Sequence, residues 1–177
     1  SDNRGLVLPP KMAPVQVVII PIAQKKEGVI EKANELFNRL KAKGIRVELD
    51  DNTEYSPGWK FNQYEMKGYP IRIEIGPRDI ENNQAVAVRR DELEKVILSL
   101  DNIEDTIYNM LETMQNDLFE KAKAHREANT YVVEDYEKYK RDLPNRPGFA
   151  KMMWCGEREC EDKLKEETGA TIRCIPF

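Results

Sequence analysis

An order of strand, helix and strand in residues 14–51 constrains the fold more than any other feature of the chain. The apolar, β-branched run PVQVVIIPI (14–22) is bounded by prolines, which predicts a strand covered on both faces. Segment 27–44 then places apolar residues at helical spacing, and Gly44 supplies a left-handed stop. IRVELDD (45–51) alternates as a second strand. This order predicts a βαβ unit with a right-handed parallel crossover.

The remaining patterns extend this unit and add a second, smaller one. Residues 70–76 and 84–90 predict two further strands, and the pattern from Leu93 to about Ala128 is helical. Beyond it we expect a helix around 133–142, a strand in FAKMMW, a helix at 159–168 and a last strand in ATIRCIPF. The predicted class is α/β, a mixed and mostly parallel sheet of about five strands flanked by helices, followed by a small α+β domain.

Composition narrows the classes of partner. The net charge of −4 is not the strongly basic footprint of a protein that binds nucleic acid by phosphate neutralisation alone, so any such contact has to be local. No apolar run approaches the roughly 20 residues that span a bilayer, and the N-terminus lacks a secretory signal pattern. Three cysteines are too few for a disulfide-stapled secreted scaffold, which predicts reduced thiols or metal ligands in a cytoplasmic protein.

One short stretch combines aromatic rings with charges. GWKFNQYEMKGYPIRIEIGPRD (58–79) holds four rings among many Lys, Arg, Asp and Glu residues. Within PIRIEIG, the period of two places Arg72 and Glu74 on one face of a strand and isoleucines on the other. The charged face is therefore expected to look away from the core. Rings and charges side by side are what a protein needs to read unpaired RNA bases.

Four segments carry a resemblance to a known family: GLVLPPKMAPVQVVIIPI, PGWKFNQYEMKGYPIRIEIGPRD, QAVAVRRD and CGERECEDKLKEETGA. They resemble the C-terminal part of prolyl-tRNA synthetase of the archaeal and eukaryotic type. The resemblance implies a linker at 1–13 from an absent catalytic domain and a class II synthetase anticodon-binding fold at 14–128. It further implies a C-terminal domain at 129–177 that stops short of the family's usual end.

The resemblance also implies a function. This chain would be the anticodon recognition module for tRNA(Pro) within a cytoplasmic, ATP-dependent proline--tRNA ligase that acts through prolyl-adenylate. ATP and Mg²⁺ would belong to the parent enzyme, which we expect to be a homodimer through the absent catalytic domain. The chain alone is expected to be inactive, to need no cofactor of its own, and to bind neither DNA nor membranes.

The resemblance assigns residues to this task. The last two anticodon bases of tRNA(Pro) are guanines, whose O6 and N7 accept from Arg or Lys and whose N1–H and N2–H₂ donate to a carboxylate. The expected anticodon-binding residues are Glu65, Arg72, Lys95 and Glu74. Residues expected to stack on tRNA or to hold its backbone are Trp59, Lys60, Phe61, Arg78, Arg89 and Arg90. Core packing of the two rings and a solvated surface role for the charges remain open alternatives.

The C-terminal knuckle CGEREC places Cys155 and Cys160 in the spacing of a zinc ligand pair. The resemblance implies that the partner pair lies beyond Phe177, so the site is incomplete and bound zinc is not favoured. Cys174 is expected to be a buried thiol. His125, in a polar context on the long helix, is expected to be an ordinary surface residue.

Two other function classes remain to be weighed. Synthetase-like α/β domains also serve for dimerisation or protein docking without anticodon reading. A free-standing α/β enzyme is disfavoured, since PIAQKKEG after the first strand is not a Gly-rich phosphate loop and no serine elbow is present. The set Glu65, Arg72 and Glu74 favours the RNA-reading module, because a docking domain has no need of that chemistry.

Overall fold

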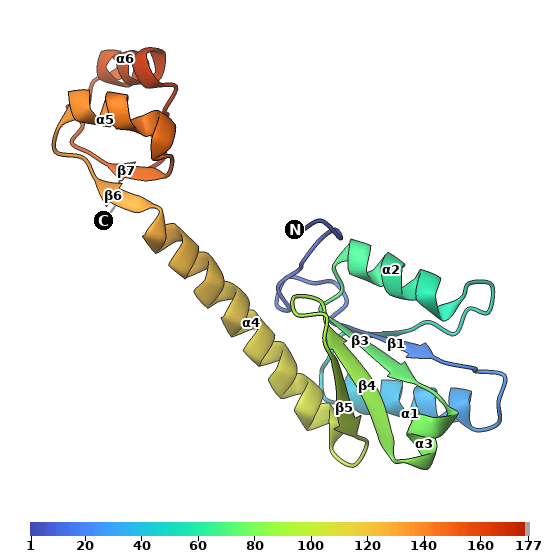
Figure 1. Ribbon diagram of the computed structural model, residues 1–177. Helices are drawn as coiled ribbons and strands as arrows, with labels where there is room; N and C mark the ends of the chain where they lie inside the picture. The colour runs from blue at the N-terminus through green and yellow to red at the C-terminus, as the bar shows by residue number, and fades with distance from the viewer. Residues whose placement is uncertain (176–177) are drawn as a thin grey trace. The chain divides into compact units, whose positions relative to one another are not determined.

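The computed structural model describes residues 1–175, which divide into two units, unit 1 (residues 1–119) and unit 2 (from residue 120 on). The elements of unit 1 are drawn in Figure 1. Its strands are β1 (Val17–Pro21), β2 (Val47–Leu49), β3 (Ile71–Ile75), β4 (Gln84–Arg89) and β5 (Lys95–Ser99). Its helices are α1 (Val29–Ala42), α2 (Pro57–Lys67), α3 (Pro77–Glu81) and the start of α4 (Ile103–Ala128).

The five strands of unit 1 form one mixed sheet in the order β2-β1-β3-β4-β5. Strand β1 is parallel to β2 and β3, as the βαβ pattern predicts, whereas β3–β4 and β4–β5 are antiparallel. The predicted α/β class with a five-stranded mixed sheet is confirmed. The sheet is less parallel than expected, because the segments that join β3, β4 and β5 are too short for a parallel crossover.

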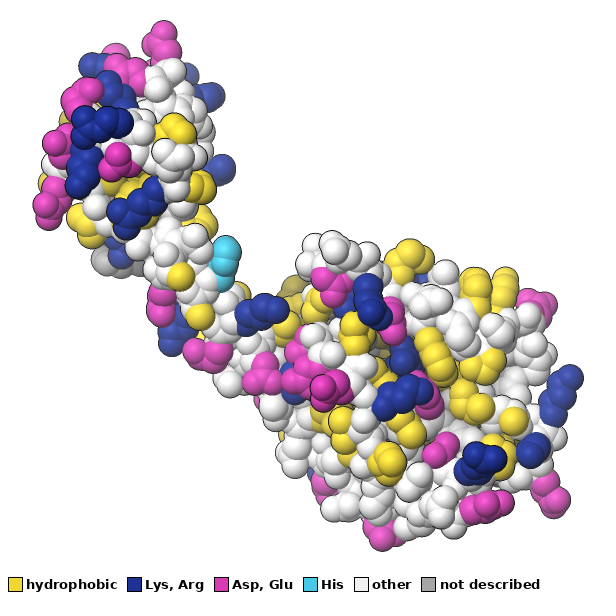
Figure 2. All heavy atoms as spheres, viewed as in Figure 1, with side chains coloured by type: hydrophobic (Ala, Val, Ile, Leu, Met, Phe, Trp, Pro, Cys, Tyr) yellow, Lys and Arg dark blue, Asp and Glu magenta, His cyan; other side chains and the backbone are white. Residues whose placement is uncertain are grey.

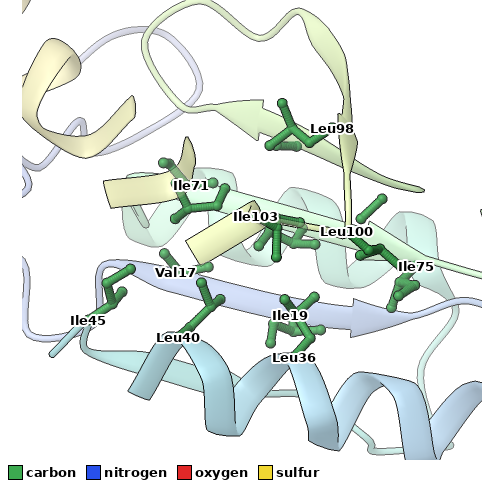
Figure 3. Close-up of a cluster of buried hydrophobic side chains, with 14 of the residues drawn as sticks. Val17, Ile19, Leu36, Leu40, Ile45, Ile71, Ile75, Leu98, Leu100 and Ile103 are labelled. Atoms are coloured by element: carbon green, nitrogen blue, oxygen red, sulfur yellow. The ribbon is translucent and has the colours of Figure 1, made fainter. Parts of the chain in front are cut away.

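Both faces of the sheet are covered, but unequally. Helices α1 and α4 cover one face, where Leu36 and Leu40 pack with Ile103 against strand side chains such as Ile19 (Figure 3). Helix α2 covers the other face over β1, with Tyr64 packed among apolar strand residues. This second face carries the charged residues of β3, so α2 decides their surroundings.

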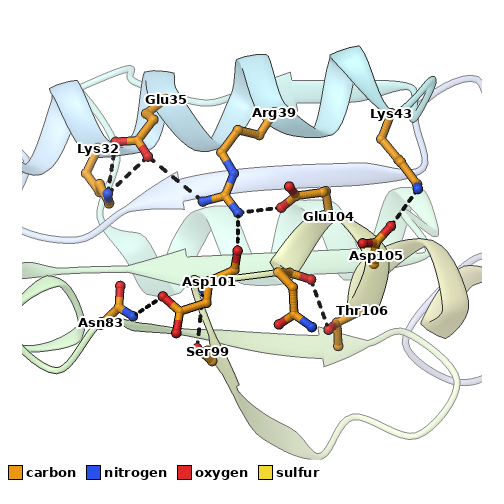
Figure 4. Close-up of polar contacts among 11 residues, drawn as sticks. Lys32, Glu35, Arg39, Lys43, Asn83, Ser99, Asp101, Glu104, Asp105 and Thr106 are labelled. Carbon is orange, nitrogen blue, oxygen red and sulfur yellow. Dashed lines mark hydrogen bonds and ion pairs between the residues drawn. The ribbon is translucent and has the colours of Figure 1, made fainter.

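The start of α4 is tied to α1 and β4 by polar contacts (Figure 4). Arg39 of α1 pairs with Glu104, and its Nη2 also donates to the carbonyl oxygen of Asp101 at 3.1 Å. Asn83 lies directly before β4, and its Nδ2 donates to Asp101 Oδ1 at 2.7 Å. These contacts fix where the long helix begins relative to the sheet.

One sequence-based expectation about unit 1 is wrong. The segment after Leu93 was expected to be helical, but residues 95–99 form strand β5, and the helix begins only at Ile103. Antiparallel pairing with β4 overrides the helical pattern of the apolar residues. Leu93 has φ of 65°, which turns the chain sharply from β4 into β5.

In its described residues, unit 2 holds the end of α4, a small two-stranded sheet, two further α-helices and a 3₁₀ helix. Its elements are β6 (Thr130–Val132), α5 (Tyr136–Asp142), a 3₁₀ helix (Leu143–Asn145), β7 (Phe149–Lys151) and α6 (Arg158–Thr168). Strands β6 and β7 are parallel. The two predicted helices are confirmed, whereas strand β6 was not predicted.

Two predictions for unit 2 are wrong. Residues 170–175 of ATIRCIPF form no strand in the described part of the chain, and FAKMMW is a strand only over its first three residues. Met153 is 96% exposed, so this run lacks the cover that a core strand needs. Leu164 and Tyr139 supply the buried contacts instead.

Two wider features follow from the described residues. No helix among them is long and apolar enough to cross a membrane. Helix α4 begins in unit 1 and continues into unit 2. The domain boundary between residues 128 and 129 stays a proposal, as do the linker at 1–13 and the domain limits 14–128 and 129–177.

Candidate nucleic-acid interface

Helix α2 carries half of the candidate interface, and local sequence fixes both its ends. Ser56 is the N-cap, and its Oγ accepts from the backbone N–H of Trp59 at 3.4 Å. Pro57 occupies the first turn, where its missing N–H costs nothing. Gly68 ends the helix with φ of 78°, a left-handed conformation that suits glycine. The helix therefore presents a defined face to the sheet.

Strand β3 carries the other half. Its side chains alternate as predicted, with the isoleucines in the main core and Arg72 and Glu74 on the face toward α2. In the sheet register Arg72 lies opposite Val88 of β4, which lies opposite Lys95 of β5. The charged face does look away from the main core, but it is buried, because α2 covers it.

Four charged side chains, which we call the β3 charge network, form a continuous chain: Glu65, Arg72, Glu74 and Lys95. Arg72 Nη1 donates to Glu65 Oε1 at 3.0 Å, and its Nε donates to Glu74 Oε1 at 3.1 Å. Lys95 Nζ donates to the second oxygen, Glu74 Oε2, at 2.8 Å. The structure thus brings together all four residues expected to bind the anticodon, including Lys95, whose match to the family is the weakest.

Phe61 of α2 lies against this network. Its ring centroid is 4.3 Å from Arg72 Cζ and 5.7 Å from Lys95 Nζ, so the ring supports both cations through its face. Phe61 is also partly buried against Tyr64 and its neighbours. Core packing and a place at the interface are therefore compatible for this ring.

The network balances two carboxylates against two cations. It therefore offers oriented donors and acceptors with little net charge, which suits the edges of bases better than phosphate groups. Charges of both signs stand side by side on the face of unit 1 that Figure 2 shows. A site so balanced exerts little long-range attraction on phosphate groups.

The network opens to solvent toward strand β5. Lys95 has 61% of its side chain exposed, whereas Arg72 and Glu74 are buried. Ile97, on the same face of β5, is 64% exposed and adds an apolar surface beside the lysine. A cavity of about 10 Å³ remains between Arg72, Glu65 and Arg90, roughly the space of one water molecule. Lys95 is therefore the most exposed member of the network.

Trp59 does not belong to the core. It is 44% exposed and stacks on Tyr55 with the ring centroids 3.9 Å apart and the planes 14° apart. The alternative of core packing is therefore wrong for this ring. Its predicted stacking on tRNA stays a prediction.

Lys60 has a partner within the chain. It is buried, and its Nζ pairs with Asp50 Oδ1 at 2.8 Å, while Tyr64 donates to the other oxygen of the same carboxylate at 3.0 Å. A phosphate contact would have to displace this pair, so the placement disfavours that role. Arg78, in contrast, is exposed on α3, and its contact with the tRNA backbone stays a prediction.

Arg89 and Arg90 are also buried in ion pairs. Arg89 bonds Asp91 at 2.7 Å and Asp117 of α4 at 2.8 Å. Arg90 bonds both carboxylate oxygens of Asp2, at 2.6 and 2.8 Å. Both guanidinium groups hold parts of the fold together, which disfavours the predicted phosphate contacts for the same reason as at Lys60.

The cysteines correct two expectations. Cys155 and Cys160 are joined by a disulfide, although reduced thiols or metal ligands were predicted. The short C-x4-C loop folds back at Gly156, which has φ of 90°, and brings the two sulfurs together. Cys174 is exposed, not buried.

The residues described hold no group of three or more His, Cys, Asp or Glu arranged for a metal ion. His125 is exposed, as predicted.

The sequence did not reveal several residues outside the β3 charge network that support its surroundings. Tyr69 donates its hydroxyl to Glu48 Oε2 at 2.9 Å, and burial together with this bond raises the pKa of Tyr69 to about 12. Arg4 lies 3.6 Å from Glu65, and Asp2 holds Arg90. Contacts between residues 21 to 88 positions apart leave no periodic signal in a sequence.

Comparison with known proteins gives two family matches. Residues 16–110 match a family model described as "Anticodon binding domain", and residues 136–177 match one described as "Prolyl-tRNA synthetase, C-terminal". Together they include the β3 charge network and the disulfide knuckle.

Similar proteins extend the match over the whole chain. "Proline--tRNA ligase" of Acetoanaerobium sticklandii is 66% identical and that of Alkaliphilus oremlandii 62% identical, each over 177 residues. The chain spans 37% of the length of these relatives and matches their C-terminal part. A crystal structure of prolyl-tRNA synthetase from Cryptosporidium parvum, complexed with L-proline and AMP, is 42% identical with a TM-score of 0.89. That match covers 99% of this chain and 38% of the other.

Proposed function

Since the chain belongs to the family of anticodon-binding domains and continues into the C-terminal domain of prolyl-tRNA synthetases, we propose that it reads the anticodon of tRNA(Pro). The β3 charge network is the observation that carries the proposal. Its donors and carboxylates are held in place by α2, β3 and β5, and they match the acceptors and donors of guanine.

We assign the parts of the network to the two sides of guanine. In exchange for the bonds that they now make with one another, Arg72 and Lys95 supply donors for O6 and N7, while Glu65 and Glu74 are acceptors for N1–H and N2–H₂. Phe61 and the exposed Ile97 offer apolar surface on which a base can rest. Arg78, exposed on α3, contacts the backbone, and Trp59 with its partner Tyr55 offers a ring for stacking.

The proposed parent protein is an ATP-dependent proline--tRNA ligase that joins proline to the tRNA through prolyl-adenylate. ATP and Mg²⁺ act in a catalytic part outside this chain, through which the parent forms a homodimer in the cytoplasm. The chain alone should then show no proline-dependent pyrophosphate exchange. Exchange above background in the purified chain would contradict this assignment.

The proposal is tested by binding to tRNA(Pro) and to a tRNA(Pro) whose two anticodon guanines are replaced by adenines, at one fixed salt concentration. Arg72→Lys keeps the charge and loses the guanidinium fork. We expect it to lower affinity for tRNA(Pro) roughly ten- to a hundredfold and to leave affinity for the substituted tRNA nearly unchanged.

Arg78→Gln is the comparison variant, because it removes an exposed charge expected to contact the backbone. It should weaken both tRNAs by a similar factor and reduce the salt dependence. If the wild-type chain binds both tRNAs equally, the β3 charge network does not read guanine and the proposal fails.

A docking function remains the second candidate, because β5 is an edge strand with exposed apolar side chains at Val96 and Ile97. Equal binding of the two tRNAs, together with concentration-dependent self-association that Ile97→Lys abolishes, would favour docking.

A further inference from the structure

We propose that residues 2–8, which we call the N-terminal strap, act with Arg90 as a positioning device for Glu65 and so set how strictly the anticodon is read. The inference rests on the proposed function. It concerns residues outside the β3 charge network.

The strap lies along the last turn of α2 (Figure 1). The backbone N–H of Leu6 donates to the carbonyl oxygen of Met66 at 3.0 Å, and that of Leu8 donates to Gly68 at 3.4 Å. The approach is so close that a Cβ built on Gly5 would lie 2.5 Å from the carbonyl oxygen of Met66. The strap is therefore fastened to the end of α2 by two backbone hydrogen bonds and one close backbone approach.

Arg90 locks this arrangement from the side of the sheet. Its Nη1 and Nη2 bond the two carboxylate oxygens of Asp2, and its Nε donates to the backbone carbonyl of Glu65 at 2.7 Å. The Arg90 side chain is 1% exposed and that of Asp2 is 44% exposed, so the pair is shielded from water on the arginine side. The pKa of Asp2 lies well below its usual range because of the bonds from Arg90.

Glu65 is thus held at both its backbone and its side chain. Arg90 bonds the backbone carbonyl, Arg72 bonds Oε1, and Arg4 of the strap lies 3.6 Å from Oε2. A carboxylate that accepts from two neighbouring groups of guanine has to be placed within about 0.5 Å. The strap supplies part of that placement from a distance, without touching the base.

The test uses the whole chain with Asp2→Asn and Arg4→Gln, and Asp2→Glu as the conservative variant. The readout is the ratio of affinities for tRNA(Pro) and for the tRNA with both guanines replaced by adenines. We expect Asp2→Asn and Arg4→Gln each to lower this ratio about fivefold, the low end for one base contact, with affinity for the substituted tRNA unchanged. Asp2→Glu should restore most of the ratio.

A merely structural strap would behave differently. Its variants would leave the ratio of affinities at the wild-type value while they lower the unfolding temperature or weaken the binding of both tRNAs by the same factor. A wild-type ratio together with either of these effects overturns the inference. A wild-type chain without any preference for the guanines overturns the proposed function and the inference together, whereas a wild-type preference that none of these variants alters overturns the inference alone.

Discussion

Replacing Arg72 by methionine tests whether the β3 charge network is a buried electrostatic unit. Arg72 is the only cation that bonds both Glu65 and Glu74 among the contacts of residues 1–175. Without it Glu74 keeps Lys95 and Glu65 keeps the more distant Arg4. Breaking a buried pair by removing one partner costs about 3–5 kcal/mol. Because each carboxylate retains one cation, we expect the low end, about 3 kcal/mol.

The assay is urea unfolding followed by tryptophan fluorescence. The chain has two tryptophans, Trp59 in unit 1 and Trp154 in unit 2, so a Trp154→Phe background makes the signal report on unit 1. Arg78→Met is the matched control, since it removes an exposed arginine of the same unit. It should change the free energy of unfolding by less than about 0.5 kcal/mol.

A second variant separates charge from packing. Arg72→Met combined with Glu74→Met removes the carboxylate that the single change leaves in the interior, and it should recover much of the lost stability. If Arg72→Met alone costs less than about 1 kcal/mol, water screens the network as it does a surface ion pair, and the reasoning is refuted.

Three further outcomes are expected. Gly5→Ala should lower stability by at least about 1 kcal/mol in thermal unfolding, because its φ of 129° and the nearby backbone of α2 leave no room for a Cβ; an unchanged unfolding temperature would contradict the close approach. Stability should fall as pH rises from about 10, where tyrosine ionises in the unfolded chain, to about 12, the pKa of folded Tyr69, and Tyr69→Phe should flatten this decline. Replacing both Cys155 and Cys160 by serine should cost unit 2 up to about 2 kcal/mol for so short a loop, and elemental analysis of the oxidised chain should find no stoichiometric zinc.

The sequence predicted the parts of the fold that local patterns specify. The buried run at 14–22, the amphipathic helix after it and the alternation in β3 each have one dominant period, and the structure has each element. Strand β5 was missed because apolar residues between Leu93 and Leu100 fit both periods, and pairing with β4 decides between them.

The candidate site was predicted in its residues but not in its environment. Alternation places Arg72 and Glu74 on one face, but only the packing of α2 over β3 buries that face. The same limit applies to Arg89 and Arg90, which look like surface charges in QAVAVRRD until Asp117 and Asp2 are placed beside them. Burial of a charge depends on tertiary contacts, which a single sequence does not encode in any short window.

The pairing of Asp2 with Arg90 has a consequence for how the chain is made. The two residues are 88 positions apart, and synthesis at roughly 5–20 residues per second separates their appearance by about 4–18 s. During that interval residues 2–8 have been made but lack the arginine that fixes them. Residues 2–8 can therefore take their place only once α2 and β4 exist to receive them.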